Sequence, residues 1–252
     1  MEQYINKIIN ADCLDILKQL PDKCVDLVLT DPPYGTTNCK WDSIVPFDDL
    51  WRELKRVRKD NCAIVIFGQE PFSSHLRLSN ISEYKYDWKY KKTLPTGHLN
   101  AKKQPMKSYE DVCVFYKQLP TYNPQKTTGH NRKFFHKIVS IENDGSHVYG
   151  KEKCDTIYDS TERYPIDIQE FNNADRTSLI HPTQKPVELF TYLINTYSNE
   201  NDLVLDCFSG SGTTAVACHN LKRRFICIEK DPEYAKASQA RLEQAQRQQT
   251  LF

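Results

Sequence analysis

Apolar runs and amphipathic stretches alternate along the first 80 residues. Continuous apolar segments are typical of parallel strands that are buried on both faces, and we expect such strands at residues 25–29 and 62–67, with a shorter one at 7–10. Apolar residues at helical spacing predict helices at residues 13–20, 48–59 and 71–78. This half of the chain therefore alternates strands with helices.

The same alternation returns after residue 180. Helices are predicted at residues 187–197, at 213–220 and from Pro232 onward, and strands at 203–205 and 225–228. In between, residues 84–92 and 112–116 read as a strand pair, whereas residues 118–178 lack periodicity and are expected to form an inserted lobe. The pattern predicts an α/β fold, doubly wound around a mostly parallel sheet.

Composition narrows the class of protein. The 252 residues are 39% hydrophobic and 27% charged, which is typical of a globular chain with a substantial core. A net charge of +1 means that any nucleic-acid surface must be a local patch. The nine cysteines form no CxxC pair, which favours buried thiols in a reducing cytosol over disulfides or zinc. Without a secretory signal or an apolar stretch of ~20 residues, we expect a cytoplasmic protein.

Two short segments, each directly after an apolar run, carry most of the chemistry. Residues 30–34 read Thr-Asp-Pro-Pro-Tyr, where the double proline keeps the backbone beside Asp31 extended. Residues 206–212 read Asp-Cys-Phe-Ser-Gly-Ser-Gly, and a helix is predicted to follow. Glycines allow a close backbone approach to a ligand, and a helix N-terminus offers free N–H groups. Glu229 ends the next strand, where a carboxylate can accept ribose hydroxyls.

Alone, each segment leaves alternatives open. The Gly-x-Gly stretch also fits a dinucleotide loop for NAD or a plain tight turn. Ala215 stands where the third glycine of a dinucleotide motif would be, and this position tolerates alanine. An Asp-Pro-Pro turn at a strand end is common in proteins. A third segment, the His-Pro-Thr-Gln-Lys-Pro run at residues 181–186, favours one interpretation.

Together the three segments resemble the β group of the DNA amino-methyltransferases, in which the catalytic loop precedes the S-adenosylmethionine loop. The resemblance spans nearly the whole chain except the insert. It implies a circularly permuted Rossmann-like methyltransferase sheet, in which the two loops lie side by side where the strand order reverses. The catalytic half would cover residues 1–117, the target-recognition lobe 118–178 and the cofactor-binding half 179–252.

The resemblance also implies a role for each matching residue. The catalytic residues would be Asp31, Pro32, Pro33 and Tyr34. Lys185 and Thr183 would face the methionine carboxylate of the cofactor, and Glu229 would bind its ribose. The complete set implied for S-adenosylmethionine is Asp12, Thr183, Lys185, Asp206, Phe208, Gly210, Gly212, Thr213 and Glu229. Ala11, before Asp12, departs from the more usual glycine, and no metal is implied.

The chemistry gives a reason for the catalytic residues. The exocyclic amine of adenine or cytosine is a poor nucleophile, because its lone pair is delocalised into the ring. Acceptors on its N–H groups, here Asp31 and the Pro32 carbonyl, pull the nitrogen toward tetrahedral geometry. Tyr34 offers a flat face on which the base can stack. The base must leave the duplex, since its amine is out of reach inside the stack.

A basic and aromatic stretch predicts the DNA surface. Residues 85–107 hold seven lysines and a single acid, with three aromatic residues interleaved. A solvated charged face would show the same composition. Residues 97–101 resemble a family segment near the target base, and Ser108-Tyr109 stands where histidine usually precedes the glutamate. We expect DNA contacts from Lys89, Lys91, Lys92, His98, Lys102 and Lys103, and from Arg132 and Lys133 of the insert.

Other partners and functions remain open. The final residues, Gln248 to Phe252, resemble short Gln-x-x-Leu-Phe peptides that dock on sliding clamps, although a frayed end is an equal alternative. A homodimer is left open. In this family, cytosine-N4 enzymes whose catalytic loop precedes the cofactor loop more often carry serine at the position of Asp31. The aspartate here therefore favours adenine N6 over cytosine N4. A protein-glutamine or RNA methyltransferase, or a catalytically silent nucleic-acid-binding relative, fits less well. We expect an adenine-specific DNA methyltransferase that is encoded by a prokaryote or a phage and belongs to restriction–modification.

Overall fold

The computed structural model describes residues 1–35, 43–139, 154–173 and 184–249, with only the backbone described at 137–139, 154–156 and 249. The chain divides into two compact units. One unit comprises Met1–Asn123 together with Asp167–Phe252, and the other is Pro124–Ile166.

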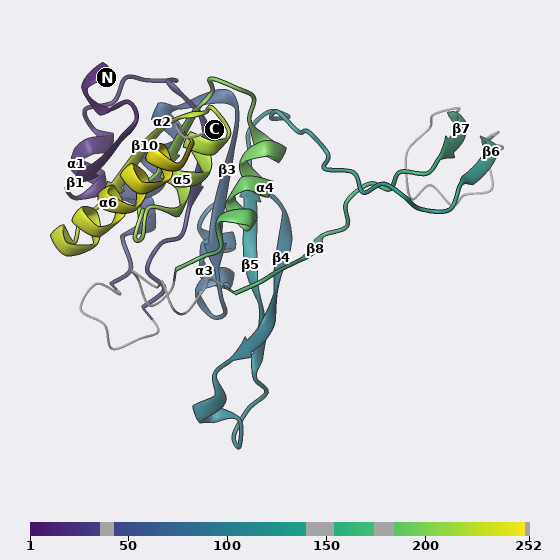
Figure 1. Cartoon of the computed structure of the whole chain (residues 1–252), viewed down its shortest axis with the longest axis horizontal. Coiled ribbons are helices and arrows are strands. Elements are labelled where there is room, and N and C mark those ends of the chain that lie inside the picture. The colour runs from purple at the N-terminus through teal and green to yellow at the C-terminus, as the bar shows by residue number, and fades with distance from the viewer. Residues whose placement is uncertain (36–42, 140–153, 174–183, 250–252) are drawn as a thin grey trace. The chain divides into compact units, whose positions relative to one another are not determined.

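Helices and strands alternate in the larger unit (Figure 1). Its strands are β1 (Lys7–Asn10), β2 (Val25–Thr30), β3 (Arg58–Gly68), β4 (Tyr84–Thr96), β5 (Lys107–Phe115), β8 (Ile168–Phe171), β9 (Leu203–Asp206) and β10 (Arg224–Glu229). Its helices are α1 (Cys13–Leu17), α2 (Phe47–Val57), α3 (Phe72–Ser79), α4 (Val187–Tyr197), α5 (Thr213–Asn220) and α6 (Pro232–Gln249), with 3₁₀ turns η1 (Glu2–Tyr4) and η2 (His98–Asn100). The smaller unit contains the antiparallel pair β6 (Lys133–Val139) and β7 (Cys154–Ser160).

The eight strands of the larger unit form one sheet in the order β1-β10-β9-β2-β3-β5-β4-β8. The first five run parallel, β5 is antiparallel to both of its neighbours, and β8 runs parallel to β4. The strand order reverses between β9 and β2, which come from opposite ends of the chain and pair directly. The predicted doubly wound, mostly parallel, permuted sheet is confirmed.

Both faces of the sheet are covered, and this explains the continuous apolar runs. On β2, Val25 and Val28 belong to one buried cluster, whereas Leu27 and Leu29 belong to the other. Residues of α1, α2 and α3 complete the first cluster, and residues of α4 and α5 complete the second. Side chains that alternate between two cores must all be apolar, so a sequence of this kind lacks the period of two seen in half-exposed strands.

Among the boundaries that differ from the sequence prediction, three have a visible structural reason. The helix expected at 48–59 ends at Val57, because Arg58 already belongs to β3, where it forms an ion pair with Glu83 at 2.6 Å. The smaller unit, residues 124–166, is narrower at both ends than the 118–178 lobe expected. Asn123 accounts for one end, since its backbone N–H donates to the Thr196 carbonyl at the end of α4. The short edge strand β8 accounts for the other.

The described part of the chain adds two observations. None of its helices has the length and hydrophobicity needed to cross a membrane. The seven cysteines whose side chains are described there are free thiols, and all but Cys24 are buried.

Candidate active site

Two loops meet at the carboxyl edge of the sheet, the Asp31 loop (residues 31–35) after β2 and the Asp206 loop (residues 206–213) at the end of β9. The parallel pairing of Leu27 with Val204 brings the two strand ends together. Thr30 connects them directly, because its Oγ1 donates to Asp206 Oδ1 at 2.7 Å and accepts from the Cys207 N–H at 3.1 Å. Segments about 175 residues apart in the sequence therefore form one site.

The Asp31 carboxylate is held on both oxygens. Tyr34 Oη donates to Oδ1 at 2.5 Å, and Lys185 Nζ donates to Oδ2 at 2.5 Å. Burial raises the pKa of Asp31, and Lys185 lowers it without cancelling the rise. The Tyr34 ring packs on the Phe72 ring, with centroids 5.0 Å apart. Pro32, which follows Asp31 in the sequence, is buried. Because each carboxylate oxygen has two lone pairs, Asp31 can still accept a hydrogen bond from a ligand.

Lys185 lies at the centre of a buried ion-pair cluster. Besides Asp31, its Nζ contacts Glu110 Oε2 at 3.1 Å. Burial lowers the pKa of Lys185, but the two carboxylates outweigh burial and the net pKa is raised. The expected partner of this lysine was the methionine carboxylate of a cofactor, whereas its partners in the structure are two protein carboxylates. Thr183, assigned with it, lies outside the described residues.

The Asp206 carboxylate organises its own loop. In addition to Thr30, it accepts from the Phe208 N–H at 3.1 Å and from the Thr214 hydroxyl. Burial raises the pKa of Asp206 to about 6. Gly212 begins α5 with φ of +73°, and a Cβ there would lie 2.8 Å from Ser238 Cβ of α6. This glycine is required by the turn and by helix packing, rather than by a ligand's approach alone.

Polar groups continue along the same edge to β10 and β1. Glu229 accepts from the Gly210 N–H at 2.7 Å and from the Asp231 N–H at 2.8 Å, and burial raises its pKa. Asp12 follows β1, the neighbour of β10, and caps α1 through the Leu14 N–H at 3.0 Å. Phe208, within the Asp206 loop, is half-buried and packs against the first core cluster. The Thr213 hydroxyl donates to the Lys185 carbonyl at 3.2 Å, which links this edge to the ion-pair cluster.

Three lysines predicted to contact DNA are instead paired within the sheet. Lys92 is buried, with its Nζ 2.5 Å from Glu110 Oε1, so in this structure it is not exposed for the predicted contact. Lys89 lies 2.5 Å from Asp111, and Lys91 lies 2.6 Å from Glu170. The acids come from neighbouring strands, and a count of charges along one segment cannot reveal them.

Beyond these lysines, β4 and β5 continue past the neighbouring strands as a hairpin (Figure 1). We call residues 93–106 the arm. His98, Lys102 and Lys103, three of the predicted DNA contacts, are all exposed on it, and the arm contains no acid. Leu99 at its tip is 88% exposed. The arm begins next to Lys92 and Glu110, so it leaves the sheet at the edge that carries Asp31.

The smaller unit carries the other two predicted DNA contacts. Arg132 forms a two-pronged ion pair with Asp159, with both N–O distances 2.6 Å. Lys133 Nζ lies 5.9 Å from the Phe135 ring centroid, and Phe134 is exposed. Both cationic side chains are exposed.

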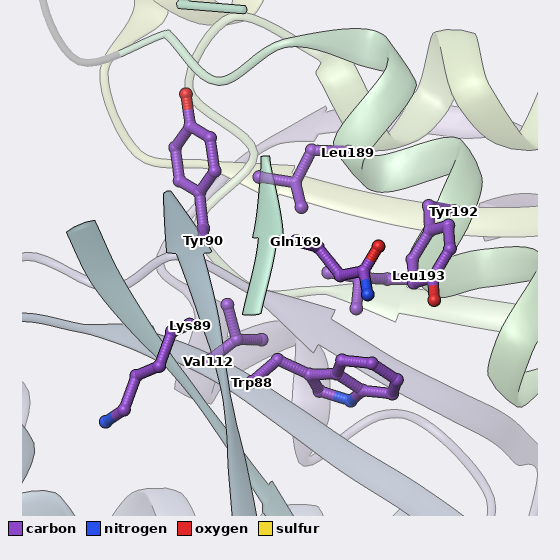
Figure 2. A pocket seen from close by; sticks show the side chains of 8 residues that line it. All are labelled: Trp88, Lys89, Tyr90, Val112, Gln169, Leu189, Tyr192 and Leu193. Carbon is purple, nitrogen blue, oxygen red and sulfur yellow. The ribbon is translucent and has the colours of Figure 1, made fainter. Parts of the chain in front are cut away.

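A separate pocket of about 200 Å³, open to solvent, lies between β4, β8 and α4 (Figure 2). Trp88, Leu189 and Tyr192 supply most of its apolar wall, while Gln169 of β8 reaches into it and Lys89 points away. None of its lining residues belongs to the Asp31 or Asp206 loop. Among the described residues, no group of three His, Cys, Asp or Glu side chains could hold a metal ion.

Sequence reasoning missed two residues that shape the site. Thr30 was noted only as the first residue of the Thr-Asp-Pro-Pro-Tyr segment, although its position directly before Asp31 was the available signal. Glu110 was noted only for the unusual residues before it, yet it joins Lys92 to Lys185. The partners of Thr30 and of Glu110 could not be derived from spacing, because they lie more than 15 residues away in the sequence.

Comparisons with known proteins agree with this geometry. A family model described as DNA methylase, for N6 and N4 methyltransferases, matches residues 25–240. The Type II methyltransferase M1.MboII of Moraxella bovis is 30% identical over 91% of this chain and 94% of its own. M.BglII of Bacillus subtilis is 27% identical over 92% of this chain and 68% of its own.

Solved structures share the fold. The M1.HpyAVI–SAM complex superposes with a TM-score of 0.63 at 25% identity, covering 94% of this chain and 99% of that one. The PvuII methyltransferase, which is cytosine-N4-specific, superposes with a TM-score of 0.67 at 17% identity, covering 95% and 89%. With its joined loops and these matches over nearly its whole length, the chain belongs to the N6/N4 DNA methylase family, as its three sequence segments predicted.

Proposed function

We propose that this DNA methyltransferase transfers a methyl group from S-adenosylmethionine to the exocyclic N6 of a flipped adenine. The observation that carries the proposal is the junction of the two loops, in which Thr30 bonds the Asp206 loop and directly precedes Asp31. A hydrogen-bond acceptor next to a cofactor loop suits methylation of an exocyclic amine, and the Asp31 carboxylate is such an acceptor. The relatives named as Type II methyltransferases support the same chemistry.

S-adenosylmethionine fits the residues along the Asp206 edge. Glu229 accepts one backbone N–H on each oxygen, so each oxygen retains a lone pair for a ribose hydroxyl. Asp12 and Phe208 would complete the adenosine end, and the backbone at Gly210 would line the path to the methionine end. M1.HpyAVI, with the same fold, is known as a SAM complex. When bound, the cofactor supplies a methyl group on a positively charged sulfur.

The chain's own residues prepare the amine for attack. Asp31 and the Pro32 carbonyl accept hydrogen bonds from the two N–H groups of the amine, which draws the nitrogen toward tetrahedral geometry and withdraws its lone pair from conjugation with the ring. Tyr34, backed by Phe72, would stack on the extruded base, and such stacking contributes about 1–3 kcal/mol per base. Rigid positioning provides much of the acceleration, up to about 7–11 kcal/mol. Acceptors fixed before the reaction stabilise the positive charge that develops on the nitrogen.

Adenine is the preferred base because an aspartate occupies the first position of the Asp-Pro-Pro-Tyr loop. Cytosine N4 is the second candidate, since the cytosine-N4-specific PvuII enzyme has the same fold. The test is to methylate DNA with the purified protein and identify the modified nucleoside by mass after digestion. N6-methyldeoxyadenosine in the digest supports the proposal. N4-methyldeoxycytidine alone would contradict it, and the absence of any methylated nucleoside would refute the activity altogether.

DNA contact is proposed for the arm and for the smaller unit. The exposed His98, Lys102 and Lys103 have no acid within the arm, so they can neutralise phosphates near the catalytic edge. Arg132 and Lys133 would contribute from the smaller unit, as part of a lobe that reads the target sequence. Lys89 and Lys91 would contact DNA only by leaving their acidic partners.

Three further statements are part of the proposal. The bacterial Type II relatives support a role in restriction–modification, and with it a cytoplasmic location. A sliding clamp is proposed as a partner of residues 248–252, of which 250–252 lie outside the described residues. Homodimer formation is kept as a hypothesis that sedimentation at enzyme concentrations would test.

A further inference from the structure

Four buried charges of alternating sign form a row from β4 to Asp31. Lys92 Nζ lies 2.5 Å from Glu110 Oε1, Glu110 Oε2 lies 3.1 Å from Lys185 Nζ, and Lys185 Nζ lies 2.5 Å from Asp31 Oδ2. The side chains are 9%, 11%, 8% and 18% exposed in that order. The row therefore contains two cations and two anions, and each inner member has an opposite charge on either side.

A row of this kind is sensitive to the loss of any member. A buried charge without a partner is costly, often by several kcal/mol, so each ion depends on the next for its ionised form. The Glu110 and Asp31 carboxylates repel each other, and Lys185 contacts both of them and offsets this repulsion. Lys185 is confined further by the rings of Tyr34 and Phe67, whose centroids lie 6.0 and 5.4 Å from its Nζ.

We propose that Glu110 and Lys92 are positioning residues for methyl transfer, which hold the Lys185 ammonium against one oxygen of Asp31. Asp31 then stays ionised in one orientation and presents a fixed acceptor to the amine of the target base. The inference rests on the proposed function, specifically on Asp31 as the acceptor. It gives two residues of the β4–β5 hairpin, outside both loops, a defined part in the reaction.

The pH dependence of the rate separates this role from a purely structural one. The charged or titratable groups that face Asp31 are Lys185 before α4, Glu110 of β5, Tyr34 of its own loop and Asp206 of β9. Replacing Lys185 by methionine leaves the Asp31 and Glu110 carboxylates without their shared cation. Their repulsion then raises the pKa of Asp31, and because Asp31 acts as an anion, the acidic limb of kcat moves to higher pH. Adding Glu110→Gln removes the repulsion and moves the limb back toward lower pH.

The first measurement is single-turnover methyl transfer at saturating DNA and cofactor. Glu110→Gln should slow transfer by about tenfold to a hundredfold, since small displacements of a catalytic group cost up to that factor. Its dissociation constant for S-adenosylmethionine should stay within about threefold, which is under about 0.7 kcal/mol. The matched control is Glu53→Gln on α2, a glutamate of similar burial whose side chain is 9% exposed and pairs with Arg52 and Arg56 rather than with a member of the row. This control should transfer methyl at the wild-type rate.

A second variant covers the case in which Glu110→Gln folds poorly. The double variant Lys92→Gln/Glu110→Gln removes one charge of each sign, keeps the row neutral, and should show the same slowing. Wild-type rates in either variant would overturn the inference, as would an equal slowing in Glu53→Gln. The inference would also be overturned if adding Glu110→Gln to the Lys185→Met variant did not move the acidic limb of the pH–rate profile back toward lower pH. An inactive wild-type chain refutes the proposed function as well, whereas an active one with an active Glu110→Gln variant refutes this inference alone.

Discussion

Thr30 offers the sharpest test of the junction between the two loops. Valine has nearly the same shape but no hydroxyl, so Thr30→Val removes both hydrogen bonds at this fully buried position without leaving a cavity. The bond to the Asp206 carboxylate is charge-assisted and contributes about 1.5–3 kcal/mol, and the orphaned Cys207 N–H costs about 1–3 kcal/mol. Because the two effects overlap, we expect the free energy of unfolding to fall by about 3 kcal/mol.

Urea unfolding measures this loss, and Thr30→Ser is the control that keeps the hydroxyl. Calorimetric titration with S-adenosylmethionine should also show weaker binding for Thr30→Val, because Asp206 and Cys207 begin the loop that we assign to the cofactor. A Thr30→Val protein that unfolds within about 0.5 kcal/mol of wild type, the usual range for a neutral substitution, would refute the reasoning.

Three more predictions concern single features. Burial raises the pKa of Asp206 to about 6, so the carboxyl group favours folding when protonated and this contribution is lost as the pH rises from about 4 to about 6. Asp206→Asn should flatten that fall in thermal-unfolding curves, and an unchanged fall would count against the shift. Replacing Lys102 and Lys103 by alanine should reduce the slope of log K for DNA against log salt by about 2, and an unchanged slope would remove the arm from the interface. Deleting residues 248–252 should abolish capture by a sliding clamp in a pull-down, and undiminished capture would dispose of that partner.

The sequence was sufficient for those features that depend on local pattern. The helix at 187–197 and the helix at 213–220 were predicted with the bounds that α4 and α5 have. The strands before Asp31 and Asp206 were recognisable because a strand buried on both faces is apolar throughout. Their adjacency followed from the family resemblance, since nothing local indicates which strands pair.

The partners of the lysines on β4 depended on how this strand is paired with its neighbours, residue by residue, and the sequence does not reveal that register. Lys92 looks like a surface charge in a run of lysines, and only the pairing of Tyr90 with Glu110 brings its acidic partner near. Lys91, one residue earlier, points to Glu170 of β8, a four-residue strand too short and polar to stand out. A shift of one residue in β4 would exchange the two faces, so the burial of Lys92 could not be predicted.

The central claim is that one pocket joins a methyl donor, held by the late half of the chain, to a base gripped by Asp31. The most direct measurement is single-turnover methyl transfer by Asp31→Ala, together with its calorimetric affinity for S-adenosylmethionine. We predict that transfer falls by about a thousandfold, as when one preorganised group is lost from a transition state, while cofactor affinity changes little. Transfer by Asp31→Ala at the wild-type rate would contradict the account.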